Sequence, residues 1–168
     1  GVASGADIIL LPEIPYDIDK IVEAIDARNK AGKGFTIIAA AEGAISKEDA
    51  KLSKKDYKKK LENRKYPSVS YEIAEKITKL TGSEARVTVP GHMQRGGSPD
   101  PYDRVLCTRL GSAAAQAILE KDYGNMIAMK NGKTKRVPLE EVAGKLKVVE
   151  PDCQMIQEAK RIGISFGD

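Results

Sequence analysis

Two short apolar runs near the start of the chain predict buried strands. The first, Asp7 to Leu11 (DIILL), is rich in β-branched residues and stops at Pro12. The second, Phe35 to Ala41 (FTIIAAA), is apolar at consecutive positions, so both of its faces are apolar. A strand that is covered by helices on both sides has this pattern. The two runs therefore indicate a sheet whose faces are both buried.

Two segments with apolar side chains at helical spacing predict amphipathic helices. The first begins at Asp17, which suits an N-cap, and its pattern ends at Gly32 and Gly34. The second follows Pro67 and is closed by Gly82. The apolar positions are Ile18, Ile21, Val22 and Ile25 in the first helix and Val69, Ile73, Ile77 and Leu80 in the second.

The rest of the chain continues to alternate between strand and helix patterns. A third strand is predicted at Ala85 to Val89 (ARVTV), followed by a glycine- and proline-rich loop from Pro90 to Arg104. The later predicted elements are an alanine-rich helix to about Glu120, strands at 126–130 and 135–137 around an Asn131-Gly132 turn, and short helices at 139–146 and 153–162. Three successive strand-to-helix transitions predict a three-layer α/β fold with a mostly parallel sheet, as a single domain over residues 1–168.

Residues 44–66 differ from their surroundings because they are rich in lysine and poor in apolar side chains. Two interpretations stay open. The stretch is a solvated, partly helical insertion, or it is a basic surface whose field attracts phosphate or an acidic partner. The chain as a whole has a net charge of only +4, so nucleic-acid binding is not favoured.

Composition and cysteine usage narrow the class of protein further. Hydrophobic residues make up 41% and charged residues 31% of the 168 positions, which is typical of a globular chain. No run is apolar enough to span a membrane, and the start lacks a secretory pattern. Cys107 and Cys153 are far apart and form no metal-binding spacing. We expect a soluble chain from a reducing cytoplasm, and the first residue, Gly1, suggests a piece of a longer protein.

Open α/β sheets bind ligands beyond the carboxyl ends of their strands, which directs attention to three loops. Glu42 directly follows the second strand, and Glu13 follows the first. Each is either a solvent-facing acid or an acceptor for sugar hydroxyls. Arg86, His92 and Arg95 lie on or beside the loop with glycines 91, 96 and 97, where their donors can hold a phosphorylated small molecule.

Other chemistries find little support in the sequence. Neither cysteine has a histidine nearby, and Ser98 lies in no nucleophile-elbow motif, so nucleophilic catalysis is set aside. No GxGxxG follows a strand and no GxxxxGK[ST] occurs, so neither standard nucleotide-binding loop is visible.

The run from Arg86 to Arg104, RVTVPGHMQRGGSPDPYDR, resembles the hallmark segment of the 6-phosphofructokinase family. The resemblance extends back through AAAEG at 39–43 and GADIILLPE at 5–13. Members transfer a phosphoryl group from ATP or pyrophosphate, with Mg²⁺, to the 1-hydroxyl of fructose 6-phosphate in glycolysis.

The resemblance also implies roles for single residues. It implies that Glu42 hydrogen-bonds the sugar, that His92 and Arg95 hold the substrate and its 6-phosphate, and that Arg86 reaches the site of a neighbouring subunit in a homo-oligomer. Asp7 and Lys33 match positions of nucleotide-effector ligands only loosely, because the residues around them differ.

The resemblance covers only the C-terminal, sugar-phosphate half of the family. The donor-phosphate loops and the catalytic aspartate belong to an N-terminal half, so no catalytic residue is expected on this chain, and alone it is expected to be inactive. The stretch 44–66 is longer than in the compact bacterial enzymes and closer to the branch with pyrophosphate-dependent and mixed-donor members. The choice between ATP and pyrophosphate stays open. The alternative function is a non-catalytic sugar-phosphate or nucleotide-sensing α/β module.

Overall fold

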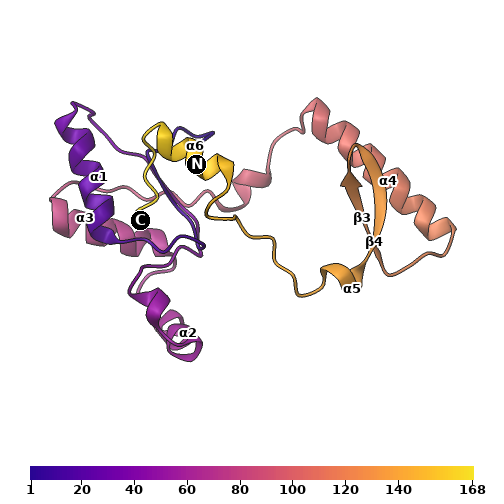
Figure 1. The fold of residues 1–168 in the computed structure, drawn as a ribbon, viewed down its shortest axis with the longest axis horizontal. Helices are drawn as coiled ribbons and strands as arrows, with labels where there is room; N and C mark the ends of the chain where they lie inside the picture. Colours follow the sequence, from indigo (N-terminus) through magenta and orange to yellow (C-terminus); the bar gives the residue numbers. More distant parts are fainter. The chain divides into compact units, whose positions relative to one another are not determined.

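The computed structural model describes all residues from 1 to 168 (Figure 1). The chain forms two compact units. Unit 1 comprises Gly1–Thr88 and Val148–Asp168, and unit 2 comprises Val89–Lys147. Unit 1 is thus assembled from two pieces of chain that are separated in sequence. The expectation of a single domain over the whole chain stays a prediction.

The sheet of unit 1 has β1 (Ile8–Leu10) at its centre. β1 pairs in parallel with β2 (Ile38–Ala40), and Ile8 lies opposite Ile38. On its other side, Ile8 forms a parallel bridge with Ser165, and the backbone N–H of Ile9 donates to the Ser165 carbonyl at 2.8 Å. Both predicted strands are confirmed, although each is shorter than its apolar run, and the bridge at Ser165 was not predicted.

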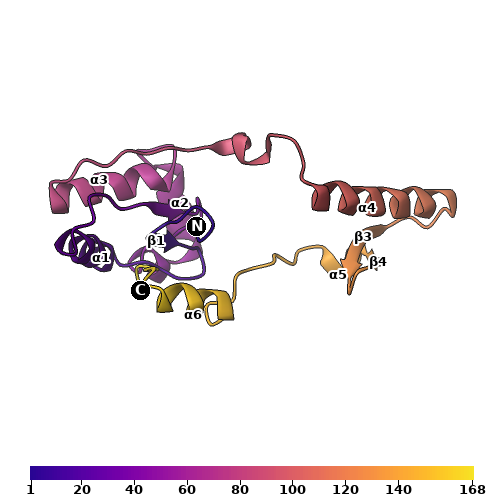
Figure 2. The same cartoon turned by 90° about the horizontal axis from the view of Figure 1, so that it is seen from above.

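Helices cover both faces of this sheet, which confirms the three-layer α/β class. The flanking helices are α1 (Ile18–Lys30), α3 (Val69–Thr81) and α6 (Gln154–Arg161). Ile8 and Leu10 pack with α1 and α3 on one face, whereas Ile9 packs with Ile156 of α6 and with Phe166 on the other. Figure 2 shows α3 and α6 on opposite sides of β1. Successive residues of β1 point to opposite faces, so one apolar run supplies both cores.

The ends of the two long helices follow the predicted signals. Asp17 caps α1, because its side chain accepts a hydrogen bond from the Asp19 N–H at 3.0 Å. Gly82 ends α3 in the left-handed conformation with φ 69°. Leu80, which the helical pattern assigned to the apolar stripe, is 56% exposed because α3 turns that side chain away from the core.

The lysine-rich stretch is partly helical, as predicted. It contains a 3-10 turn, η1 (Asp49–Lys51), and a helix, α2 (Lys54–Glu62). Ser53 caps α2 by accepting from the Asp56 N–H at 3.1 Å. α2 has no buried residue, so hydrophobic packing contributes little to it.

Unit 2 consists of a long helix and a hairpin. Its elements are η2 (Gly91–Arg95), α4 (Pro101–Leu119), β3 (Asn125–Lys130), β4 (Lys133–Pro138) and α5 (Leu139–Val142). β3 and β4 are antiparallel and are joined by Asn131 and Gly132, with φ 50° and 72°. Two consecutive positive φ angles match the right-handed twist of a hairpin, so this prediction is confirmed. Among the apolar side chains of unit 2, only Ala117 is buried.

The predicted strand at Ala85–Val89 is wrong. These residues form no ladder, and no backbone hydrogen bond joins them to another segment. β-branched side chains favour an extended chain, but a strand also needs a partner for its N–H and C=O groups. The segment therefore has strand composition without strand pairing. Separately, none of the helices combines the length and the apolar composition that crossing a membrane requires.

Candidate functional site

Glu42 lies at the carboxyl end of β2, where the α/β fold predicts a ligand. The Ala41 N–H donates to the Leu10 carbonyl at 2.9 Å, so parallel pairing continues to the residue before Glu42. The next residue, Gly43, turns tightly against Pro12, because a Cβ at position 43 would lie 3.1 Å from Pro12 Cγ. The strand pairing and this turn place the Glu42 side chain beyond the strand end.

Two side chains hold the carboxylate of Glu42. Arg64 Nη1 lies 3.1 Å from Oε1, and the Ser68 hydroxyl donates to Oε2 at 2.7 Å. Ser68 is buried and also caps α3 by accepting from the Ser70 N–H at 3.2 Å. The Glu42 side chain nevertheless remains 61% exposed. A carboxylate has about four lone-pair directions, so some still face solvent, where they can accept from a ligand hydroxyl.

Glu13, the acid at the end of β1, has a different environment. Its Oε1 accepts from the Val149 N–H at 3.1 Å, and its Oε2 is buried without a hydrogen-bond partner. The side chain thus ties the returning C-terminal piece of unit 1 to the strand end. This contact favours a structural role over a ligand-facing one.

Asp7 is also engaged within the fold. It pairs with Arg28 of α1 at 2.8 Å and accepts from the Ile37 N–H at 2.8 Å. Both contacts join β1 to neighbouring elements, so they account for this carboxylate without an effector. Lys33 is exposed and makes no ion pair.

Arg86 lies in unit 1 on the unpaired segment that precedes the glycine-rich loop. Its side chain is 86% exposed, and its ion-pair partner is Glu84, two residues away, at 3.0 Å. An exposed ion pair of this kind contributes little to stability. The guanidinium is therefore available to a further anionic partner.

His92 and Arg95 lie in unit 2 on the single turn η2. Pro90 and Met93 carbonyls accept from the backbone N–H groups of Met93 and Gly96, both at 3.1 Å, which closes the turn. In a 3-10 helix, residues three apart eclipse each other, so His92 and Arg95 share one face. Both are exposed, and neither side chain forms a hydrogen bond or ion pair within the chain. Together they present unpaired donors suited to a phosphate.

The four predicted site residues are thus divided between the units. Glu42 and Arg86 belong to unit 1, where they have separate partners, and His92 and Arg95 belong to unit 2, where one turn brings them together. Sequence reasoning missed Arg64 and Ser68. Ser68 had a local signal, because it follows Pro67 at the start of a predicted helix, whereas Arg64 had only its position in the basic stretch.

A cavity of about 280 Å³ lies between the basic stretch and α3. Its wall includes Tyr16, Lys60 and Arg64. Tyr16 is buried, and this burial, with the nearby carboxylates of Glu72 and Asp49, raises its pKa to about 12. The phenol therefore stays neutral at physiological pH.

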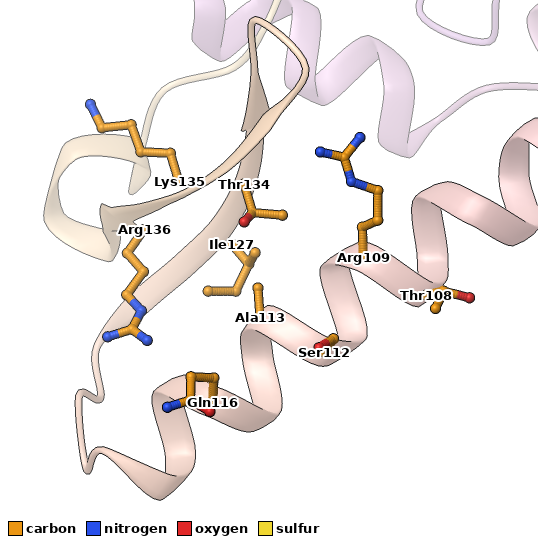
Figure 3. A pocket seen from close by; sticks show the side chains of 9 residues that line it. All are labelled: Thr108, Arg109, Ser112, Ala113, Gln116, Ile127, Thr134, Lys135 and Arg136. Atoms are coloured by element: carbon orange, nitrogen blue, oxygen red, sulfur yellow. The ribbon is translucent and has the colours of Figure 1, made fainter.

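A second cavity, of about 690 Å³, lies in unit 2 between α4 and the hairpin (Figure 3). Arg109 lines it and donates to the Gly132 carbonyl. Arg136 pairs with Glu120 at 2.6 Å and Asp122 at 2.8 Å, and the hydrogen bonds that its guanidinium donates to these carboxylates raise its pKa. Arg109 therefore joins α4 to the hairpin turn, and Arg136 joins β4 to the segment that follows α4.

No group of three or more histidine, cysteine or acidic side chains that could hold a metal ion occurs in the chain. The residues present therefore do not fit a magnesium site.

These features define an α/β fold with a supported carboxylate at a strand end and a turn that carries an exposed histidine and arginine. The family profile of phosphofructokinase matches residues 1–118, and the chain belongs to the phosphofructokinase family.

Relatives with curated names agree with this assignment. An ATP-dependent 6-phosphofructokinase of Spirochaeta thermophila is 49% identical over the whole of this chain and 46% of its own length. One from Chloroflexus aurantiacus is 41% identical over the whole chain and 45% of its own length. The chain thus spans about half the length of the curated relatives it matches.

Solved structures support the same fold. Phosphofructokinase from Saccharomyces cerevisiae is 30% identical with a TM-score of 0.59, over 84% of this chain and 18% of that chain. A pyrophosphate-dependent phosphofructokinase from Nitrosospira multiformis has a TM-score of 0.66 at 18% identity, over 96% of this chain and 41% of that one. The latter likeness concerns the fold alone.

Proposed function

We propose that this chain is the C-terminal, sugar-phosphate-binding half of a 6-phosphofructokinase, which phosphorylates fructose 6-phosphate to fructose 1,6-bisphosphate in glycolysis. The observation that carries the proposal is the pair His92 and Arg95, which share one face of η2 and have no partner within the chain. Family membership and the names of the relatives support it.

In this proposal the chain's own residues align the acceptor sugar. Arg95 and His92 bind the 6-phosphate, and Glu42 accepts hydrogen bonds from the sugar hydroxyls. Alignment matters because phosphoryl transfer requires little covalent chemistry from the protein beyond positioning and charge stabilisation. Arg86 completes the 6-phosphate site of a neighbouring subunit in a homo-oligomer, and its high exposure and weak internal pairing support this role.

The phosphoryl donor and Mg²⁺ are assigned to the remainder of the full-length enzyme. ATP is the favoured donor, because relatives 38% to 49% identical to the chain are named ATP-dependent. The chain alone is therefore expected not to transfer a phosphoryl group. A non-catalytic sensing module is not favoured, because these relatives are named as kinases.

The test is a coupled assay of fructose 6-phosphate phosphorylation by the full-length enzyme and its Arg95→Ala variant. We expect KM for fructose 6-phosphate to rise by a factor on the order of 10 to 100, the value of one charge-assisted contact, with little change in KM for ATP or pyrophosphate. Arg161→Ala, which removes an exposed arginine that makes no ion pair, is the matched control. Sugar-phosphate binding without turnover by the unmutated enzyme would favour the sensing module. Equal loss for sugar and donor in Arg95→Ala would contradict the role of Arg95.

A further inference from the structure

We propose that Arg64, in the basic stretch 44–66, is a positioning residue that orients the Glu42 carboxylate toward the sugar, together with Ser68. This inference rests on the proposed function, because it concerns how the sugar-binding acid is held. It gives the basic stretch a role in the site that neither of its sequence-based interpretations included.

The contacts fix the carboxylate at both oxygens. Arg64 engages Oε1 at 3.1 Å, and Ser68 engages Oε2 at 2.7 Å. The terminal torsion of a glutamate is otherwise broad, so an exposed Glu42 without these partners would sample many carboxylate orientations. Two donors, one on each carboxylate oxygen, select one of these orientations. A preoriented acceptor loses less entropy when the ligand binds.

The exposed fractions of the three side chains indicate which one a ligand can reach. Ser68 is 6% exposed as a residue, and the Arg64 side chain is 20% exposed, whereas the Glu42 side chain is 61% exposed. The two donors therefore form the support, and the carboxylate is the group that solvent and ligand can reach. Arg64 acts through Glu42 and not on the substrate.

The basic stretch is itself anchored, so it can hold Arg64 in place. Near its start, the Tyr16 N–H donates to the Ile45 carbonyl at 2.9 Å, and the Lys47 N–H donates to the Tyr16 carbonyl at 2.8 Å. Near its end, Lys65 pairs with Glu75 of α3 at 3.2 Å. The start of the stretch is thus held by backbone hydrogen bonds, and the Arg64 side chain is only 20% exposed, whereas the lysines of α2 are all exposed.

The experiment is a double-mutant cycle in the full-length enzyme with Glu42→Gln, Arg64→Gln and the double variant. Steady-state assays give kcat and KM for fructose 6-phosphate and for the donor. We expect Arg64→Gln to raise KM for fructose 6-phosphate about tenfold without changing the donor KM. In the Glu42→Gln background the same change should have less than about a twofold effect, because the group that Arg64 positions is altered.

Lys60→Gln is the matched control, because Lys60 belongs to the same stretch and pairs closely, at 2.6 Å, with an acid other than Glu42, namely Asp49. It should lower the melting temperature about as much as Arg64→Gln while leaving KM unchanged.

Arg64→Lys keeps the charge and should recover part of the affinity, and it replaces Arg64→Gln if that variant does not fold. Ser68→Thr, which keeps the hydroxyl, should bind the sugar better than Ser68→Ala.

Each outcome separates the two proposals. If the unmutated enzyme phosphorylates fructose 6-phosphate but Arg64→Gln leaves its KM unchanged, the positioning role is wrong and the function stands. An equal effect of Arg64→Gln in both backgrounds would mean that Arg64 touches the substrate directly, which also overturns the positioning role. An unmutated enzyme that does not act on fructose 6-phosphate would remove the function and this inference together.

Discussion

Gly167 lies so close to Tyr16 that a side chain at position 167 would force its neighbours to shift. A Cβ built there would lie 3.0 Å from Tyr16 Cβ, and the residue has φ +72°. The Gly167 carbonyl also accepts from the N–H of Asp17 at 2.7 Å. The last residues of the chain therefore close over the start of α1 and belong to the core of unit 1.

Gly167→Ala should consequently destabilise the protein more than an alanine at another left-handed glycine. We expect a loss of about 2 to 4 kcal/mol, from backbone strain and overpacking together. Gly82→Ala is the control, because Gly82 has φ +69° with nothing within 4 Å of the added Cβ, and strain alone should cost about 1 kcal/mol. Urea unfolding followed by circular dichroism measures both, and equal losses would contradict the close packing at Gly167.

The cluster around Glu75 predicts a loss of stability in acid. Lys79, with Tyr66 and Lys65, lowers the pKa of Glu75 to about 2. Because this pKa is lower in the folded than in the unfolded chain, the stabilisation is complete above about pH 4.5 and is lost as the pH falls toward 2. Glu75→Gln should flatten the fall in the urea midpoint between pH 5 and pH 3, whereas Glu141→Gln, at an exposed acid without an ion pair, should not. Parallel acid curves for Glu75→Gln and the unmutated protein would refute this account.

The buried Tyr16 predicts the opposite dependence in alkali. Its pKa is raised from 10.0 to about 12, mainly by burial, so the unfolded chain loses this proton first. The stabilisation is therefore complete below about pH 10 and is lost as the pH rises toward 12. Tyr16→Phe should match the unmutated protein near pH 8 and be relatively more stable near pH 11, as measured by thermal unfolding. A constant difference across that range would show that Tyr16 ionises normally.

The features that the sequence predicted correctly are those set by neighbouring residues. The Asp17 cap, the Gly82 end and the Asn131-Gly132 turn each depend on a few adjacent positions. The strand at 85–89 failed because β-branched composition is local, whereas the required partner strand is not. Glu42 was located from its place after an apolar run, but its pairing with Arg64 spans 22 positions across a segment without apolar periodicity, and no local pattern encodes it.

A subunit-mixing experiment tests the shared site. If Arg86 completes a neighbour's site, full-length Arg86→Ala and Glu42→Gln variants should each bind fructose 6-phosphate weakly alone. Mixed oligomers contain some sites with both native residues, and random mixing of dimers should restore about a quarter of the native sites. Activity of the mixture, measured after dissociation and reassembly, should exceed that of either variant. A mixture no better than the mean of the two would place both residues in the same subunit's site.

The order in which the pieces of unit 1 occur in the chain has a consequence during synthesis on the ribosome. Ser165 bridges β1, and Ile156 and Phe166 pack against Ile9, yet these partners emerge after all of unit 2 has been made. Until then, one face and one edge of the first strand stay open on the nascent chain. Exposed strand edges and apolar faces promote aggregation, so the part of unit 1 that is made first depends on protection until the segment after unit 2 has emerged.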